Sequence, residues 1–130
     1  MLGEQTRAPD AIVAVDVGSS DDSADILVEA LGADRVHQMA APSGLTGFGE
    51  AVQAGVSTLS TEQVTETEWL WLLHDDSAPD PDCLSELLAA AQAHPRAVIL
   101  GAKARGWHDR RLLLEVGFTI TGSGRRFTDL

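Results

Sequence analysis

The sequence predicts an α/β domain built on a mostly parallel sheet. Short runs of β-branched and apolar residues alternate with stretches in which apolar residues recur at helical spacing. Acids and glycines follow the apolar runs, as expected where strands lead into loops. This alternation is typical of parallel strands joined by right-handed helical crossovers. The length of 130 residues allows one compact domain and is too short for two, and a hydrophobic content of 44% excludes simple disorder.

The first strand–helix pair is predicted near the beginning of the chain. Ala11–Asp16 is a β-branched run that ends at an acid and leads into a glycine–serine loop. Asp21–Leu31 carries apolar residues at helical spacing, and Gly32 is a typical residue after the last turn of a helix. We therefore expect a buried strand, a loop and a helix here.

A second pair follows directly. Arg35–Ala40 is a short predicted strand, Gly44–Gly49 is a glycine-rich loop, and Phe48–Leu59 is a predicted helix. Glycines in such a loop can let the backbone approach a phosphate, although glycine spacing alone is weak evidence.

The most apolar run predicts a central strand. Trp69–Leu73 is too short for a helix, and we expect it to be buried on both faces, with Trp69 and Trp71 in the core rather than forming a stacking platform. The strand is expected to end at His74, and either Asp80 or Asp82 is expected to cap the next helix.

The remaining elements are one helix and two strands. Cys83–His94 has an apolar stripe at helical spacing and ends at Pro95. Ala97–Ala102 is a predicted buried strand, and Leu112–Ile120 is a further predicted strand.

Charge divides the chain unevenly. Residues 1–100 hold 3 basic and 17 acidic side chains, whereas residues 101–130 hold 6 basic and 3 acidic ones, and the formal net charge is −11. This balance argues against nucleic-acid binding through a basic surface. No apolar run is long enough for a membrane span or a signal peptide, and the single cysteine, Cys83, excludes an internal disulfide.

The acidic residues allow two interpretations. One is a solvated face that aids solubility, and the other is convergence of some carboxylates on a cation. Asp16 ends the first predicted strand, and Asp75 and Asp76 follow the third, so all three are expected at the same edge of a parallel sheet. Paired carboxylates suit Mg²⁺ or Mn²⁺, which prefer oxygen ligands and share their remaining positions with phosphates. His74 is either a further ligand or a residue that orients a neighbouring carboxylate.

Three segments resemble motifs of family 2 inverting glycosyltransferases, which use nucleotide-sugars and have the GT-A fold. The first, VDVGSSDDS over residues 15–23, resembles the family's VDNGSTDGS signature. The second, GFGEAVQAG over residues 47–55, resembles GFGxAxNxG, and the third, WLWLLHDDSAPDP over residues 69–81, resembles a strand ending in LDDDxxPxP. The three occur in the family's order and spacing. The chain departs from the family's pattern at four positions: Val17, Leu45, Gln53 and His74.

The resemblance implies a Rossmann-like, mostly parallel sheet of the GT-A type and metal-dependent transfer of a sugar with inversion. It implies Mg²⁺ or Mn²⁺ held by Asp76 and Asp75, the ion bridging the diphosphate of the donor. Donor-binding residues carried over from the motifs are Asp16, Gly18, Ser19, Gly47 and Asp75. The acceptor is expected to be a glycan or a lipid-linked sugar, and large relatives suggest a cytoplasmic location, with the parent protein anchored at the membrane.

The resemblance further implies a partial catalytic domain over residues 1–130. Gly3–Asp10 resembles the end of the family's first helix, so the first strand is expected to be absent, as is the C-terminal acceptor half with its catalytic base. No catalytic residue is therefore assigned, and we expect the chain to be inactive alone. An incomplete sheet has open edges, which favour self-association.

Two further alternatives stay open. A phosphoryl-accepting receiver domain also has acids after two strands, with Asp75 or Asp76 as acceptor and Lys103 as sensor, but it needs more strand–helix steps between them. The basic residues after position 100 either line a cleft for phosphates or an anionic acceptor, or form a solvated hairpin. These residues include Lys103, Arg105, Arg110 and Arg111.

Overall fold

The computed structural model describes residues 2–39, 47–59, 68–117, 119–120, 122–123 and 126–127. The chain divides into two compact units, one formed by residues 9–77 and the other by residues 1–8 together with 78–130. The predicted single partial domain over residues 1–130 stays a prediction.

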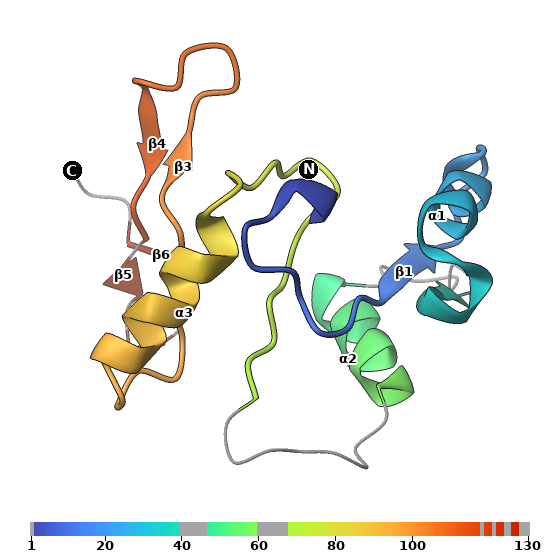
Figure 1. The fold of residues 1–130 in the computed structure, drawn as a ribbon, viewed down its shortest axis with the longest axis horizontal. Helices are drawn as coiled ribbons and strands as arrows, with labels where there is room; N and C mark the ends of the chain where they lie inside the picture. Colours follow the sequence, from blue (N-terminus) through green and yellow to red (C-terminus); the bar gives the residue numbers. More distant parts are fainter. Residues whose placement is uncertain are drawn as a thin grey trace. The chain divides into compact units, whose positions relative to one another are not determined.

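The unit of residues 9–77 contains a parallel pair of strands, as the sequence predicts. Strand β1 (Ala14–Val17) pairs with β2 (Val36–Met39), and Asp16 lies opposite Gln38. Between them run helix α1 (Ser23–Leu31) and the short 3₁₀ helix η2 (Ala33–Arg35) (Figure 1). Gly32 ends α1 with a φ of 93°, a backbone conformation that strongly favours glycine. The α/β class and the small parallel sheet are therefore as predicted.

Helix α2 (Phe48–Thr58) packs on the strand pair through a glycine. Gly55 is the buried residue of this helix, and a Cβ atom added there would lie 2.8 Å from Cγ2 of Val15 and 3.6 Å from Cγ1 of Val13. The absence of a side chain thus lets the backbone of α2 come directly onto the β-branched residues around β1.

The prediction of a central strand over Trp69–Leu73 is wrong, since this segment pairs with no strand among the described residues. Its side chains are also more accessible than predicted: Trp69, Leu70 and Leu72 are 36%, 52% and 49% exposed, and Trp71 is only half-buried. An apolar extended segment becomes a buried strand only when a neighbouring strand takes up its hydrogen bonds and other elements cover its faces.

The second unit contains helix α3 (Cys83–Ala93), which is joined to the N-terminal segment by a glutamine. Gln5 follows the 3₁₀ helix η1 (Leu2–Glu4) and is buried. Its Nε2 donates to the carbonyl of Asp80 at 2.8 Å, and its Oε1 accepts from the backbone N–H of Leu84 at 3.2 Å. Asp82 occupies the N-cap position, but its side chain makes no capping hydrogen bond. The predicted aspartate cap is thus replaced by an amide from a distant part of the sequence.

The strands of this unit are short and antiparallel. Strand β3 (Ala104–Arg105) pairs with β4 (Leu113–Glu115), and β5 (Thr119–Ile120) pairs with β6 (Arg126–Phe127). The strand predicted over residues 112–120 is therefore two separate short strands. These pairs add antiparallel structure that the alternating pattern did not predict.

The buried strand predicted over Ala97–Ala102 is also wrong. This segment has no strand partner among the described residues, and Val98 and Ile99 are 85% and 86% exposed. None of the described helices has the length and apolarity needed to cross a membrane.

Candidate functional site

The candidate site centres on a tight turn after the apolar segment of residues 69–73. The backbone N–H of Ser77 donates to the carbonyl of His74 at 3.1 Å, and the Ser77 hydroxyl donates to the same oxygen at 2.6 Å. The two hydrogen bonds close a turn over His74–Ser77 with Asp75 and Asp76 at its centre. The local sequence, a strand-like run followed by Asp-Asp-Ser and prolines, accounts for this reversal.

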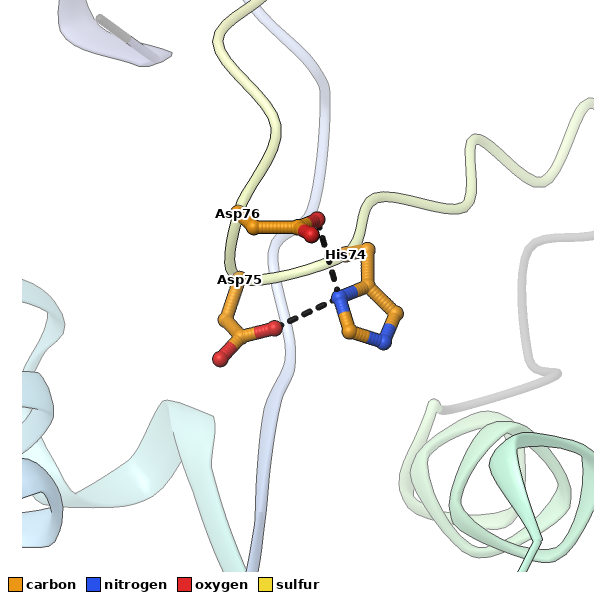
Figure 2. Close-up of side chains that lie close together, drawn as sticks. All are labelled: His74, Asp75 and Asp76. Atoms are coloured by element: carbon orange, nitrogen blue, oxygen red, sulfur yellow. Dashed lines mark hydrogen bonds and ion pairs between the residues drawn. The ribbon is translucent and has the colours of Figure 1, made fainter.

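The turn brings three potential metal ligands together (Figure 2). Nδ1 of His74 lies 2.5 Å from Oδ1 of Asp75 and 3.1 Å from Oδ1 of Asp76. The ligand atoms of all three residues lie within 4.8 Å of one another. Within the described parts of the chain, this is the one group of at least three such side chains.

The chemistry of this cluster fits a hard divalent cation. The side chains of Asp75 and Asp76 are 91% and 85% exposed, so both carboxylates are accessible from solvent. Among the residues that the structure describes, no lysine or arginine pairs with either carboxylate. Two adjacent carboxylates with a single imidazole supply hard oxygen donors and leave negative charge to neutralise, a set that suits Mg²⁺ or Mn²⁺.

His74 contacts both carboxylates through one ring nitrogen. Because Nδ1 lies close to Oδ1 of both Asp75 and Asp76, this arrangement fits the interpretation that the histidine orients the two carboxylates. The other nitrogen, Nε2, points away from the acids in Figure 2.

Phe48 is a neighbour of this cluster that the sequence reasoning missed. Its ring stacks on the His74 ring with 5.7 Å between centroids and an angle of 28° between planes. Phe48 is the first residue of α2 and is 50% exposed, so the stack links the start of this helix to the acidic turn. The sequence offered one signal, an aromatic residue within the glycine-rich loop, between Gly47 and Gly49.

Asp16 lies at a second place in the same unit, near the end of β1. It is 7% exposed, and it accepts hydrogen bonds from the hydroxyl and, at 3.4 Å, from the backbone N–H of Ser19. Gly18 between them has a φ of 64°, which lets the chain turn sharply. The predicted donor-binding residues of this loop therefore form one structured turn, in which the carboxylate fixes the serine.

Gly47 precedes α2 as its N-cap residue, and its carbonyl accepts from the N–H of Glu50 at 3.0 Å. Gly47 is exposed, and a Cβ atom added there would meet nothing within 4 Å. Residues 44–46 of the predicted glycine loop, Leu45 among them, lie outside the described residues. Gly47 is thus adjacent in sequence to the phenylalanine that stacks on His74.

The structure therefore groups most of the predicted residues in two turns, one around Asp16 and one around Asp75 and Asp76, while Gly47 lies at the start of α2. The predicted placement of all three acids at one edge of a shared sheet is wrong for the described residues, because residues 69–73 do not join the parallel pair.

The comparison with known families gives one match. The sequence model of the family described as Glycosyl transferase family 2 matches residues 2–116, which include both turns and the β3–β4 hairpin. No curated protein and no solved structure matches the chain.

Proposed function

Because the chain belongs to glycosyl transferase family 2, we propose that it forms the donor-binding part of a metal-dependent transferase that uses a nucleotide-sugar and inverts its anomeric centre. The family itself assigns the chain to the glycosyltransferases. The single observation that carries the proposed metal dependence is the exposed cluster of His74, Asp75 and Asp76, whose ligand atoms lie within 4.8 Å of one another.

In this proposal Asp76 and Asp75 hold Mg²⁺ or Mn²⁺. Both carboxylates are exposed and follow an extended apolar segment, so a diphosphate can approach them from solvent. A divalent cation supplies charge neutralisation for the departing nucleoside diphosphate. His74 keeps the two carboxylates oriented by its Nδ1 contacts, and Phe48 limits the rotation of the imidazole by stacking on it.

The nucleotide portion of the donor is assigned to Asp16, Gly18, Ser19 and Gly47, with Asp75 facing the ribose or the metal shell. Support comes from the turn after β1, in which the buried Asp16 holds Ser19 while Gly18 and Ser19 stay exposed. Support for Gly47 is its position at the start of α2, where nothing lies within 4 Å of an added Cβ atom and the end of a helix favours negative charge.

The acceptor is proposed to be a glycan or a lipid-linked sugar, and the site is proposed to face the cytoplasm in a protein anchored at the membrane. The catalytic base is not assigned to any residue of this chain. Donor binding, rather than turnover, is therefore the appropriate test. The family match favours this function over a phosphoryl-accepting receiver domain.

The test is titration of the chain with UDP-, GDP- and dTDP-sugars, each with and without Mn²⁺. We expect one of them to bind in a Mn²⁺-dependent manner and expect Asp76→Asn to remove that dependence. Asp34→Asn is the matched control, since Asp34 is an exposed acid in η2 of the same unit. Metal-independent binding that survives Asp76→Asn would contradict the proposed role of the cation.

The open strand edges also support a proposal of self-association. Strands β1 and β2 form a sheet of two strands, so each has one edge without a partner among the described residues. Light scattering across a concentration series tests this, because a mass that stays at 13.8 kDa would count against it.

A further inference from the structure

The β3–β4 hairpin carries a hollow lined almost entirely by cations. The hollow has a volume of about 340 Å³. Four of its five lining residues are basic, namely Lys103, Arg105, Arg110 and Arg111, and the fifth is the apolar Leu113. A concentration of positive charge is unusual in a chain whose formal net charge is −11.

The strand register explains why these side chains share one face. Arg105 lies opposite Leu113 in the antiparallel pair, next to an irregularity in the register between Ala104 and Arg105, and residues opposite each other project to the same side of a sheet. Lys103 immediately precedes β3 and lines the same hollow.

The connecting turn brings the remaining two arginines to the same hollow. The N–H of Gly106 donates to the carbonyl of Leu112 at 2.8 Å, and the N–H of Leu112 donates to the carbonyl of Asp109 at 3.0 Å. A Cβ atom at Gly106 would lie 2.7 Å from the carbonyl oxygen of Asp109, so the turn requires glycine. These backbone hydrogen bonds thus hold the turn that carries Arg110 and Arg111.

Among the residues that the structure describes, one of the four cations has a carboxylate partner. Arg110 forms an ion pair with Asp80. Within the described parts of the chain, no carboxylate pairs with the side chains of Lys103, Arg105 or Arg111. The carboxylate of Asp109 is directed to the backbone N–H of Arg111, at 2.9 Å, and contributes a turn hydrogen bond.

We propose that this hollow binds a phosphate-bearing ligand carrying at least two negative charges, such as a diphosphate. Guanidinium groups bind phosphate oxygens through paired N–H donors, and an ammonium group adds a point charge. The site is distinct in chemistry from the acidic turn, because it recruits the anion through cations of the protein without a metal ion. The ligand is either a soluble phosphate compound or the headgroup of a lipid.

The experiment measures binding of inorganic pyrophosphate to the chain by titration calorimetry in EDTA, which removes any metal-bridged binding. The same chain is tested for sedimentation with vesicles of phosphatidic acid in phosphatidylcholine. The variant Arg105→Gln/Arg111→Gln is expected to weaken binding by at least about tenfold, since two charge-assisted contacts are lost. The matched control, Arg35→Gln, changes an exposed arginine in η2 and is expected to leave binding unchanged.

Each outcome has a defined meaning. Saturable pyrophosphate binding that weakens in the double variant supports the site with a soluble ligand, and vesicle binding with the same dependence supports it with a lipid headgroup. Arg105→Lys/Arg111→Lys keeps the charge and is expected to retain most of the binding, and circular dichroism checks that the variants fold. Absence of binding in both arms, or binding unchanged in the double Gln variant, would overturn the proposal.

Discussion

Nδ1 of His74 lies 3.1 Å from Oδ1 of Asp76, and the same nitrogen lies 2.5 Å from Oδ1 of Asp75. One imidazole therefore contacts both carboxylates of the acidic turn from a single edge of its ring (Figure 2). The histidine can therefore either orient the two carboxylates or bind the cation itself, and replacing it has a different effect in each case.

Replacing His74 is expected to weaken Mn²⁺ binding less than replacing Asp76. If His74 orients the carboxylates, His74→Ala leaves the oxygen ligands in place and costs on the order of tenfold in affinity, as for other residues that position ligands. Asp76→Asn removes a charged oxygen ligand and is expected to cost more. Electron paramagnetic resonance of free Mn²⁺ gives both affinities, and an equal loss in the two variants would instead identify His74 as a ligand.

Gly55→Ala is expected to destabilise the unit of residues 9–77. The new methyl group would lie 2.8 Å from Cγ2 of Val15, so α2 must shift from the strand pair, at a cost of about 1–3 kcal/mol. Gly49→Ala is the matched control in the same helix, because nothing lies within 4 Å of its added Cβ, and it is expected to stabilise by about 0.5 kcal/mol. Urea denaturation measures both, and equal effects would contradict the packing described here.

Gln5→Ala is expected to destabilise α3. The substitution removes the bond to the carbonyl of Asp80 and leaves the N–H of Leu84 without its acceptor, for a loss of about 1–2 kcal/mol. Gln92→Ala tests the specificity of the effect, since Gln92 is exposed on α3 and alanine favours helix. Thermal unfolding followed at 222 nm compares them, and a Gln5→Ala variant as stable as Gln92→Ala would exclude the cap.

The pKa of Asp21 is lowered from its ordinary value of 3.8 by hydrogen bonds from the side chain and the backbone N–H of Ser23. The ionised carboxyl thus adds stability above about pH 3.8, and this stability is lost as the pH falls through the lower folded pKa. Ser23→Ala is expected to raise the Asp21 pKa toward 3.8, whereas Ser57→Ala in α2 should leave it unchanged. A carboxyl-carbon NMR titration measures the change, and an Asp21 pKa that does not respond to Ser23→Ala would refute the assigned cause.

Local sequence signals predicted the helices better than the strands. The helices begin at Ser23, Phe48 and Cys83, within two residues of the predicted starts, because spacing and the residues at helix ends are local properties. Trp69–Leu73 and Ala97–Ala102 have the composition of buried strands, yet a strand also needs a partner that composition does not specify. The Gln5 cap was unpredictable for the same reason, since it joins residues far apart in sequence.

The candidate site was predictable where its residues are consecutive. His74, Asp75 and Asp76 are neighbours in the chain, so a tight turn suffices to bring their ligand atoms together. Phe48 joins them only through the folded unit, and no spacing rule connects it with His74. The basic hollow lies on the antiparallel pair of β3 and β4. The sequence predicted a single strand over residues 112–120 and did not predict this pairing.

The most direct test of the proposed metal centre is Mn²⁺ binding by the chain and by Asp75→Asn/Asp76→Asn, with Asp34→Asn as the control. We expect one bound Mn²⁺ in the unaltered chain and in Asp34→Asn, and loss of that binding in the double variant, since both charged oxygen ligands are gone. Mn²⁺ binding of equal affinity in the double variant would contradict the assignment of the cation to this turn.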